Sequence, residues 1–236
     1  MASSARRPVF DDLPRVLRER FVYPAPDRRF AQGESIWFDE ERPASAFSFL
    51  SEGCVKLVKT HASGRESIIH IAFPGELLCQ SATVLGEAYC CTAIVASPHA
   101  LVKQVSRAKL VGACERETEV ANDLLQLGAG RTITLCRRVE ELTSGRVEQR
   151  LARLFERLSE RFGEDRGGGS VLVRIRLSRR DLADLSATTI ETTIRVMKRL
   201  EREGIISTVT DGFVVSSLGE LQSVCERPSQ PPSSDD

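Results

Sequence analysis

The sequence contains no long apolar run: none approaches the roughly 20 residues that a membrane-spanning helix needs. Its start, MASSARRPVF, is charged but lacks the apolar stretch of a secretory signal. It has no excess of charge, because 33 Lys and Arg residues balance 33 Asp and Glu residues. These absences argue against a membrane partner, against secretion and against a basic field over the whole molecule. We therefore expect a cytoplasmic protein.

Cysteine and histidine form no recognisable ligand pattern. Seven Cys residues are scattered along the chain without a Cys-x-x-Cys pair, which argues against a disulfide framework and a structural zinc site. Only three His residues are present, and they do not cluster with carboxylates as a catalytic metal centre requires. The sequence therefore predicts no metal site and no catalytic residues, and it argues against a cupin-like enzyme.

Between Gly33 and Ser106 the sequence has many short runs that are rich in β-branched residues or alternate between apolar and polar residues. Turn signals such as Pro74-Gly75 separate these runs. Many short strands at this spacing predict an antiparallel β-sandwich or β-barrel, and a jelly-roll-like barrel is the arrangement we expect. The expected strands are Ser35–Phe38, Ala46–Leu50, Cys54–Thr60, Glu66–Ala72, Glu76–Leu78, Cys91–Ala96 and Ala100–Val105.

A long helix is predicted from Glu117 to Leu142, preceded by shorter helices over Asp11–Arg20 and Ser106–Glu115. Apolar or small residues recur along the long helix in alternating steps of four and three, the pattern of a two-stranded seam. The seam predicts a homodimer, although the same stripe could instead pack on the barrel. Its principal residues are Leu125, Thr132, Leu135 and Val139.

The stretch from Leu177 to Ile206 has the pattern of a helix-turn-helix. Two capping boxes, Ser178 with Asp181 and Thr188 with Glu191, mark the starts of two helices. The second helix has an apolar stripe on one face and side chains able to reach bases on the other. The stripe is Thr193, Val196, Met197 and Leu200, and the opposite face is Ile190, Glu191, Ile194, Arg195 and Lys198.

Charge supports this reading, because the segment from Ser170 to Leu200 has seven basic and three acidic residues, a local excess of four positive charges. The alternative is an ordinary amphipathic hairpin with a solvated face. Around it we expect a hinge at Thr143-Ser144-Gly145, a helix over Arg146–Phe162, a loop over Gly163–Gly169 and a strand over Val171–Ile175. A β-hairpin with an Asp-Gly turn, Ile206–Ser216, would form a wing.

The predicted fold is therefore α+β. A sensor barrel occupies residues 1–116, a dimerisation helix 117–142, a winged helix-turn-helix 143–226 and a disordered tail 227–236.

Five segments carry a resemblance that spans about Gly33 to Leu221. GESI and LSEGCVKL, with PGE after them, are similar to the G-E-x-I, L-x-x-G-x-V-K-L and P-G-E segments of the Crp/Fnr family of bacterial transcription regulators. GRVEQRL is similar to the family's G-R-x-x-x-x-L. The segment LSRRDLADLSATTIETTIRVMKRLEREGII resembles the family's DNA-reading helices. The resemblance implies double-stranded DNA and RNA polymerase as partners, and activation of transcription.

The resemblance places Glu191 and Arg195 at the family's two base-reading positions and Arg179 at a phosphate-contacting position. Glu accepts from cytosine N4 and Arg donates to guanine O6 and N7. Their i, i+4 spacing would also allow them to hold each other in register. Thr189 and Lys198 complete the predicted DNA contacts.

The chain departs from the family at Ile190 and Ile194, where members carry an Arg or a Ser. One hypothesis is that these isoleucines contact thymine methyl groups. The alternative is that they pack against the wing.

The effector positions also depart from the family. Where cyclic-nucleotide-binding members have a Glu and an Arg-Ser or Arg-Thr pair, this chain has Gln80, then Cys91 and Thr92, with Ser81 beside Gln80. Loss of the Arg removes the main partner for a phosphate, so cyclic-nucleotide control is disfavoured. The N-terminus lacks the Cys cluster of iron–sulfur members. Haem remains a possible cofactor, because Cys79 falls where a carbon-monoxide-sensing member of the family has a Cys ligand. That member has a His two residues later, where this chain has Ser81.

Two further hypotheses concern the signal. Thiol redox sensing would use Cys79, Cys90, Cys91, Cys114 and Cys136, expected near the junction of barrel and helix. A regulator that needs no ligand is the other. The sequence does not choose between these and a haem or nitric-oxide sensor.

Overall fold

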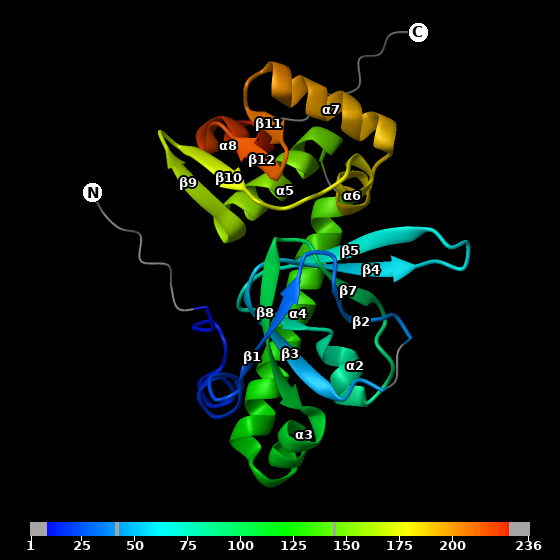
Figure 1. Cartoon of the computed structure of the whole chain (residues 1–236), viewed down its shortest axis with the longest axis vertical. Helices are drawn as coiled ribbons and strands as arrows, with labels where there is room; N and C mark the ends of the chain where they lie inside the picture. The colour runs from blue at the N-terminus through cyan, green and yellow to red at the C-terminus, as the bar shows by residue number, and fades with distance from the viewer. Residues whose placement is uncertain (1–8, 41–42, 144, 227–236) are drawn as a thin grey trace. The chain divides into compact units, whose positions relative to one another are not determined.

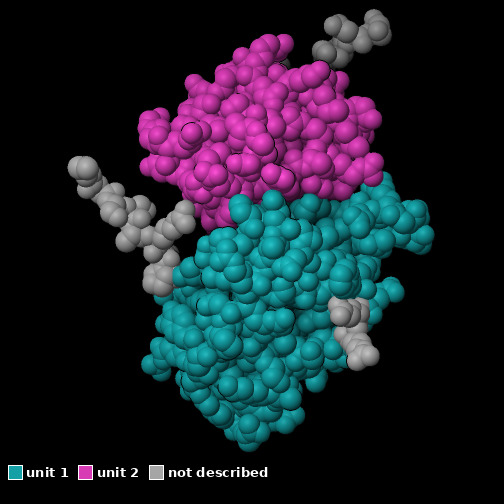
Figure 2. Space-filling model, in the orientation of Figure 1, with its two compact units in different colours: residues 1–135 teal, residues 136–236 magenta. Residues whose placement is uncertain are grey.

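The computed structural model describes residues 9–40, 43–143 and 145–226. The chain divides into two compact units, residues 1–135 and 136–236 (Figure 2). The predicted tail 227–236 and Ser144 of the predicted hinge lie outside the described residues.

Two four-stranded antiparallel sheets form the centre of the first unit (Figure 1). One has the strand order β1-β8-β3-β6 and the other β2-β7-β4-β5. The strands of the first sheet are β1 (Asp27–Ala31), β8 (His99–Ser106), β3 (Ala46–Glu52) and β6 (Leu77–Leu78). Those of the second are β2 (Ser35–Trp37), β7 (Thr92–Val95), β4 (Val55–Thr60) and β5 (Glu66–Ala72).

Of the two predicted arrangements the structure has the sandwich and not the barrel, because no ladder joins these two sheets within the described residues. Alternating side chains from both sheets, among them Trp37, Leu57, Val95 and Val102, share one buried cluster. Two facing sheets bury these faces without closing hydrogen bonds around the edge. The unpredicted strand β1 begins Asp-Arg-Arg, is mostly exposed and pairs only with β8, so its sequence has little apolar alternation.

Helices flank the sheets of this unit. They are α1 (Arg15–Leu17), continued by the π-helical turn η1 (Arg18–Val22), then α2 (Gln80–Leu85), α3 (Arg107–Arg116) and α4 (Thr118–Thr143). Asp123 of α4 accepts hydrogen bonds from the backbone N–H groups of Val16 and Leu17, at 3.0 and 3.2 Å, and so ties α1 to α4. The predicted helices over 106–115 and 117–142 are confirmed within about a residue, whereas α2 was not predicted, since six residues show too little periodicity.

The second unit is a helical domain with one small sheet. Its elements are α5 (Val147–Phe162), β9 (Gly163–Gly167), β10 (Ser170–Val173), α6 (Arg179–Leu185), α7 (Ile190–Arg202), β11 (Ile206–Val209), β12 (Gly212–Val215) and α8 (Leu218–Glu226). The sheet order is β11-β12-β10-β9. Phe155 of α5 packs edge-on against Phe213 of β12, with ring centroids 5.1 Å apart.

The predicted hairpin over Ile206–Ser216 is confirmed by the pairing of β11 with β12, but two local details in this unit are wrong. Residues predicted as a loop over Gly163–Gly169 include β9, an exposed edge strand whose charged sequence gives no alternation. The wing turn consists of Thr210 and Asp211, while Gly212 belongs to β12. Gly212 is needed there because a Cβ atom would lie 2.1 Å from the carbonyl oxygen of Val173.

The longest helix, α4, has Leu125, Leu135 and Val139 exposed to 70%, 50% and 61%, and Thr132 is also exposed. These four residues therefore do not pack on the sheets of their own chain, which was the alternative to a dimer seam. Throughout the described ranges, no helix combines the length and apolarity that crossing a bilayer demands.

Candidate nucleic-acid interface

Helix α6 begins as predicted. The Ser178 hydroxyl accepts from the N–H of Asp181 at 3.1 Å, and the Asp181 carboxylate accepts from the N–H of Ser178 at 2.9 Å. This reciprocal capping box fixes the first turn. Leu182, Ala183 and Leu185 are buried, so one face of α6 packs in the core.

Two arginines hold the turn between α6 and α7. Arg150 donates to the carbonyl oxygens of Ser186, at 2.8 Å, Ala187, at 3.2 Å, and Gly145, at 3.0 Å. Arg138 donates to the carbonyl of Leu185. Ala187 has a φ of +46°, a left-handed conformation that is costly for an L-residue, so the turn needs this outside support. Burial and the nearby Arg157 lower the pKa of the Arg138 guanidinium, which remains paired with Glu141.

Helix α7 starts one residue later than predicted. Thr189, rather than Thr188, is the cap, and its hydroxyl accepts from the N–H of Thr192 at 3.2 Å. The predicted capping box of Thr188 with Glu191 is therefore wrong, because Thr188 is still in the turn. The buried stripe of α7 is confirmed, and its members are Thr193, Val196, Met197 and Leu200.

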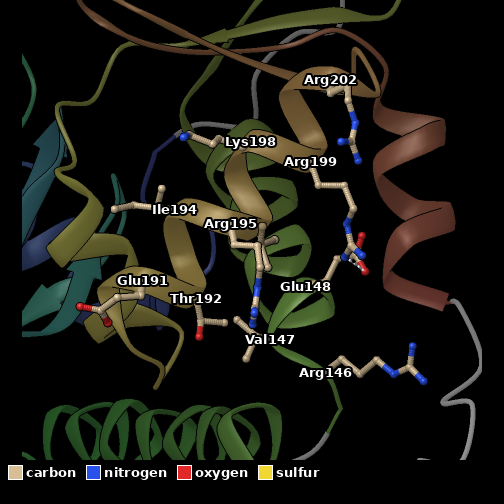
Figure 3. Close-up of a pocket in the computed structure, with 11 residues that line it drawn as sticks. Arg146, Val147, Glu148, Glu191, Thr192, Ile194, Arg195, Lys198, Arg199 and Arg202 are labelled. Carbon is tan, nitrogen blue, oxygen red and sulfur yellow. Dashed lines mark ion pairs between the residues drawn. The ribbon is translucent and has the colours of Figure 1, made fainter. Parts of the chain in front are cut away.

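Burial of that stripe turns the other side of α7 to solvent. Glu191, Ile194, Arg195 and Lys198 are exposed, and Ile190 is half-buried. The four exposed residues border a groove of roughly 800 Å³ between α7 and the start of α5 (Figure 3), and Ile190 does not line it. The basic residues along the groove are Arg146, Arg195, Lys198, Arg199 and Arg202, and the acidic ones are Glu148 and Glu191, which leaves an excess of three positive charges.

The charged side chains divide between the two edges of α7. Glu191 and Lys198 point to one side, whereas Arg195 extends toward Val147 at the start of α5 (Figure 3). The expected contact between Glu191 and Arg195 is not present among the ion pairs of the described residues, because the two side chains diverge. Arg199 instead pairs with Glu148, which is 9% exposed.

Arg179 lies away from this groove in an internal network. Its guanidinium donates to Glu201 at 3.2 Å and to the hydroxyl of Thr208 in the wing at 2.9 Å. The Thr208 hydroxyl in turn donates to Glu201 at 2.7 Å. The predicted phosphate contact of Arg179 would have to compete with Glu201.

The predicted effector positions are occupied by intramolecular bonds. The Gln80 amide donates to the carbonyl of Leu124 in α4 at 3.2 Å, and the Thr92 hydroxyl accepts from the N–H of Asp39 at 2.9 Å. Ser81 is exposed on α2 and Cys91 is fully buried. None of these four residues supplies the positive charge that a cyclic phosphate needs.

Of the five cysteines expected near the junction of barrel and helix, Cys79, Cys90 and Cys91 lie together, with all three sulfur atoms within 4.8 Å of one another. A hydrogen bond from the Cys79 thiol lowers the pKa of Cys91, and burial raises the pKa of Cys90. Cys114, half-buried in α3, and Cys136, exposed on α4, do not belong to this group.

Two domain families match the chain. The cyclic nucleotide-binding domain family matches residues 27–117, and the Crp-like helix-turn-helix domain family matches residues 149–224.

Among relatives, the nitrogen fixation regulation protein FixK of Bradyrhizobium diazoefficiens is 27% identical over 192 residues, which are 78% of this chain and 75% of that protein. The transcriptional activatory protein AadR of Rhodopseudomonas palustris is 28% identical over 209 residues, 84% of this chain and 80% of that protein. The solved structure of FixK2 from Bradyrhizobium japonicum has the same fold, with a TM-score of 0.70 and 22% identity, over 87% of this chain and 99% of that one.

The hold of Arg150 on the turn predicts a stability effect. Arg150→Met should lower the free energy of unfolding of residues 136–236 by about 2 kcal/mol, because three carbonyls lose a charged donor. Urea unfolding followed by circular dichroism measures this. Arg161→Met, on the exposed side of the same helix, is the matched control and should change stability by less than about 0.5 kcal/mol. Equal losses in both variants would contradict the assigned role of Arg150.

Proposed function

Because the chain belongs to the Crp/Fnr family of transcription regulators, which are not enzymes, we propose that it is a homodimer that reads a palindromic DNA site with Glu191 and Arg195. The observation that carries the proposal is the capped helix α7, whose buried stripe leaves these two side chains exposed beside a positively charged groove. A recognition helix in the major groove needs this division of faces.

Each exposed group on α7 has a counterpart on DNA. The Glu191 carboxylate accepts from cytosine N4, and Arg195 donates to guanine O6 and N7. Ile194 is an apolar side chain 37% exposed on the same face, and with Ile190 it matches the C5-methyl group of thymine. Thr189, at the N-terminus of α7, and Lys198 supply donors for phosphate oxygens, and Arg179 would do so after leaving Glu201.

The dimer is proposed to form along α4. Large apolar side chains at Leu125, Leu135 and Val139 are at least half exposed in the single chain, and burying them in a second copy is favourable. Two-fold symmetry would then present two copies of α7 to half-sites one helical turn apart. In this arrangement Thr132 is a small polar member of the seam.

We expect the regulator to act in the cytoplasm, where bacterial DNA lies, and to activate transcription through contact with RNA polymerase, in keeping with the name of the relative AadR. Control would come from the first unit and reach the DNA-reading unit through the hinge at Gly145, whose φ is +76°. Cyclic nucleotide is disfavoured as the signal because Gln80, Cys91 and Thr92 offer no cation.

The base-reading role of Arg195 predicts a loss of specificity. On a palindromic duplex selected from a random library, Arg195→Ala should weaken binding by about 1–3 kcal/mol, and non-specific binding by less. Lys198→Ala is the matched comparison, and it should weaken both by similar amounts and reduce the salt slope by about one. Fluorescence anisotropy over a range of salt concentrations measures both. The role of Arg195 would be refuted by equal losses on the two DNAs.

The isoleucines predict a dependence on thymine methyl groups. Replacing thymine by uracil at single positions of the selected half-site should weaken binding by about 0.8 kcal/mol at one or two positions, the value of one buried methyl group. Ile194→Ala should abolish this difference at its own position. If every uracil substitution is silent, the isoleucines do not contact thymine.

The α4 seam predicts a change of oligomeric state. Leu125→Glu removes about 1.5–3 kcal/mol of burial per copy, so the dimer dissociation constant should rise at least about 100-fold. Gln126→Glu adds the same charge at the next exposed position, outside the predicted seam, and should leave the dimer intact. Sedimentation velocity distinguishes monomer from dimer. A dimer that survives Leu125→Glu would place the interface elsewhere.

A further inference from the structure

Three thiols converge in the first unit at a place that the proposed DNA reading does not use. Cys79 lies between β6 and α2, at the N-cap position of α2, and Cys90 and Cys91 directly precede β7. The sulfur atoms of Cys79 and Cys91 are 3.3 Å apart, and all three sulfurs lie within 4.8 Å of one another. Within the described ranges, this is the one cluster of its kind.

The surrounding structure contacts the backbone of Cys91, and the backbone of Cys79 has an unusual conformation. The carbonyl of Cys91 accepts from the indole N–H of Trp37 at 2.9 Å, and Trp37 stacks on Tyr89 with ring centroids 4.4 Å apart. Cys79 is held at a φ of +45°, a left-handed conformation that a non-glycine residue rarely adopts. The three thiols grade from exposed Cys90 through half-buried Cys79 to buried Cys91, so an ion could enter from solvent at Cys90.

We propose that Cys79, Cys90 and Cys91 bind a thiophilic metal ion, Zn²⁺ or Cu⁺, through three sulfur atoms. Thiolates are the ligands that select these ions over harder cations. A metal about 2.3 Å from each sulfur separates the sulfurs by about 3.8–4.0 Å, so the group needs only small shifts to surround one ion. Each thiol releases its proton to solvent as its bond to the metal forms, and no oxidant or reductant is required.

A metal fits the group better than a disulfide does. A disulfide would join two of the sulfurs and leave the third unused, whereas one ion engages all three. The two metals differ in what else they need. Three sulfurs complete a trigonal Cu⁺ site, whereas tetrahedral Zn²⁺ keeps a fourth position for water. The absence of a Cys-x-x-Cys pair therefore does not exclude a metal site in this chain.

The cluster is connected to the long helix α4. Gln80 follows Cys79 directly, and its amide donates to the carbonyl of Leu124. Gly128 of α4 is also close to this side chain, because a Cβ atom at Gly128 would lie 3.5 Å from the amide nitrogen of Gln80. A metal that repositions Cys79 would therefore shift the first turn of α2 against α4. That this shift regulates DNA binding rests on the proposed function, whereas metal binding itself does not.

The experiment uses the reduced full chain under anaerobic conditions. Zn²⁺ and Cu⁺ are titrated separately against chromophoric competitors, and we expect one ion per chain for at least one of the two metals. Cys90→Ser and Cys79→Ser should each weaken that binding at least about 100-fold, since losing a ligand costs more than losing an outer-shell partner. Cys114→Ser, which removes a half-buried thiol outside the cluster, is the control and should bind as the parent chain does.

Cys90 is exposed, so Cys90→Ser tests the site without disturbing the core, and the fluorescence of buried Trp37 checks the fold of each variant. Equal affinity in Cys90→Ser and the parent chain would overturn the proposal. The proposal would also be overturned by a haem absorption band that is lost in Cys79→Ser. A reduced chain that binds neither metal would overturn it as well.

DNA binding is measured in the same samples with and without the bound metal. A metal-dependent change that is lost in Cys90→Ser supports the regulatory part, and the same DNA affinity in both states refutes that part alone. If no DNA sequence is bound specifically, the proposed function fails, while the metal stoichiometry still decides whether the site exists.

Discussion

Burial of one stripe of α7 is the constraint on which the proposed DNA-reading surface depends. A helix has 3.6 residues per turn, so once Thr193, Met197 and Leu200 face the core, the direction of every other side chain is fixed. Glu191 and Arg195 are exposed for this reason alone. Any rotation of α7 about its axis would bury charged groups, which costs free energy. The packing that stabilises the fold therefore also orients the exposed side chains of α7.

The turn before α7 shows how this orientation is maintained. Ala187 adopts a left-handed conformation in a turn that lacks glycine, and Arg150 and Arg138 compensate by binding the carbonyls around it. The recognition helix is thus supported from α5 and from the end of α4 rather than by its own turn. Ion pairs join α7 to its neighbours: Arg199 pairs with Glu148 of α5, and Glu201 pairs with Arg179 of α6. Such pairs reduce the unpaired positive charge, which favours contacts made by the exposed groups over general attraction to phosphate.

Periodic features were predictable from the sequence, because they depend on neighbours a few residues away. The stripe of α7, the capping box of Ser178 and the extent of α4 all follow from local spacing, and the structure confirms them. Strand β1 and strand β9 were missed for the opposite reason. Each is a charged edge strand, formed because a partner strand offers hydrogen bonds, so its own sequence carries little signal. Alternation shows that a face is buried but not whether the sheets close, so the sequence could not choose between a barrel and a sandwich.

The grouping of the three cysteine sulfur atoms could not be predicted from sequence spacing. Cys79 and Cys91 are separated by twelve positions and lie on segments of no shared period, so no spacing rule relates their sulfur atoms. Their approach follows from two pairings, β6 with β3 and β7 with β4, that belong to different sheets of the sandwich. A ligand pattern in sequence detects only sites whose ligands recur at a known spacing. Where facing sheets bring distant strand ends together, the donors of a site are fixed by topology, and only the folded chain shows which side chains can share a ligand.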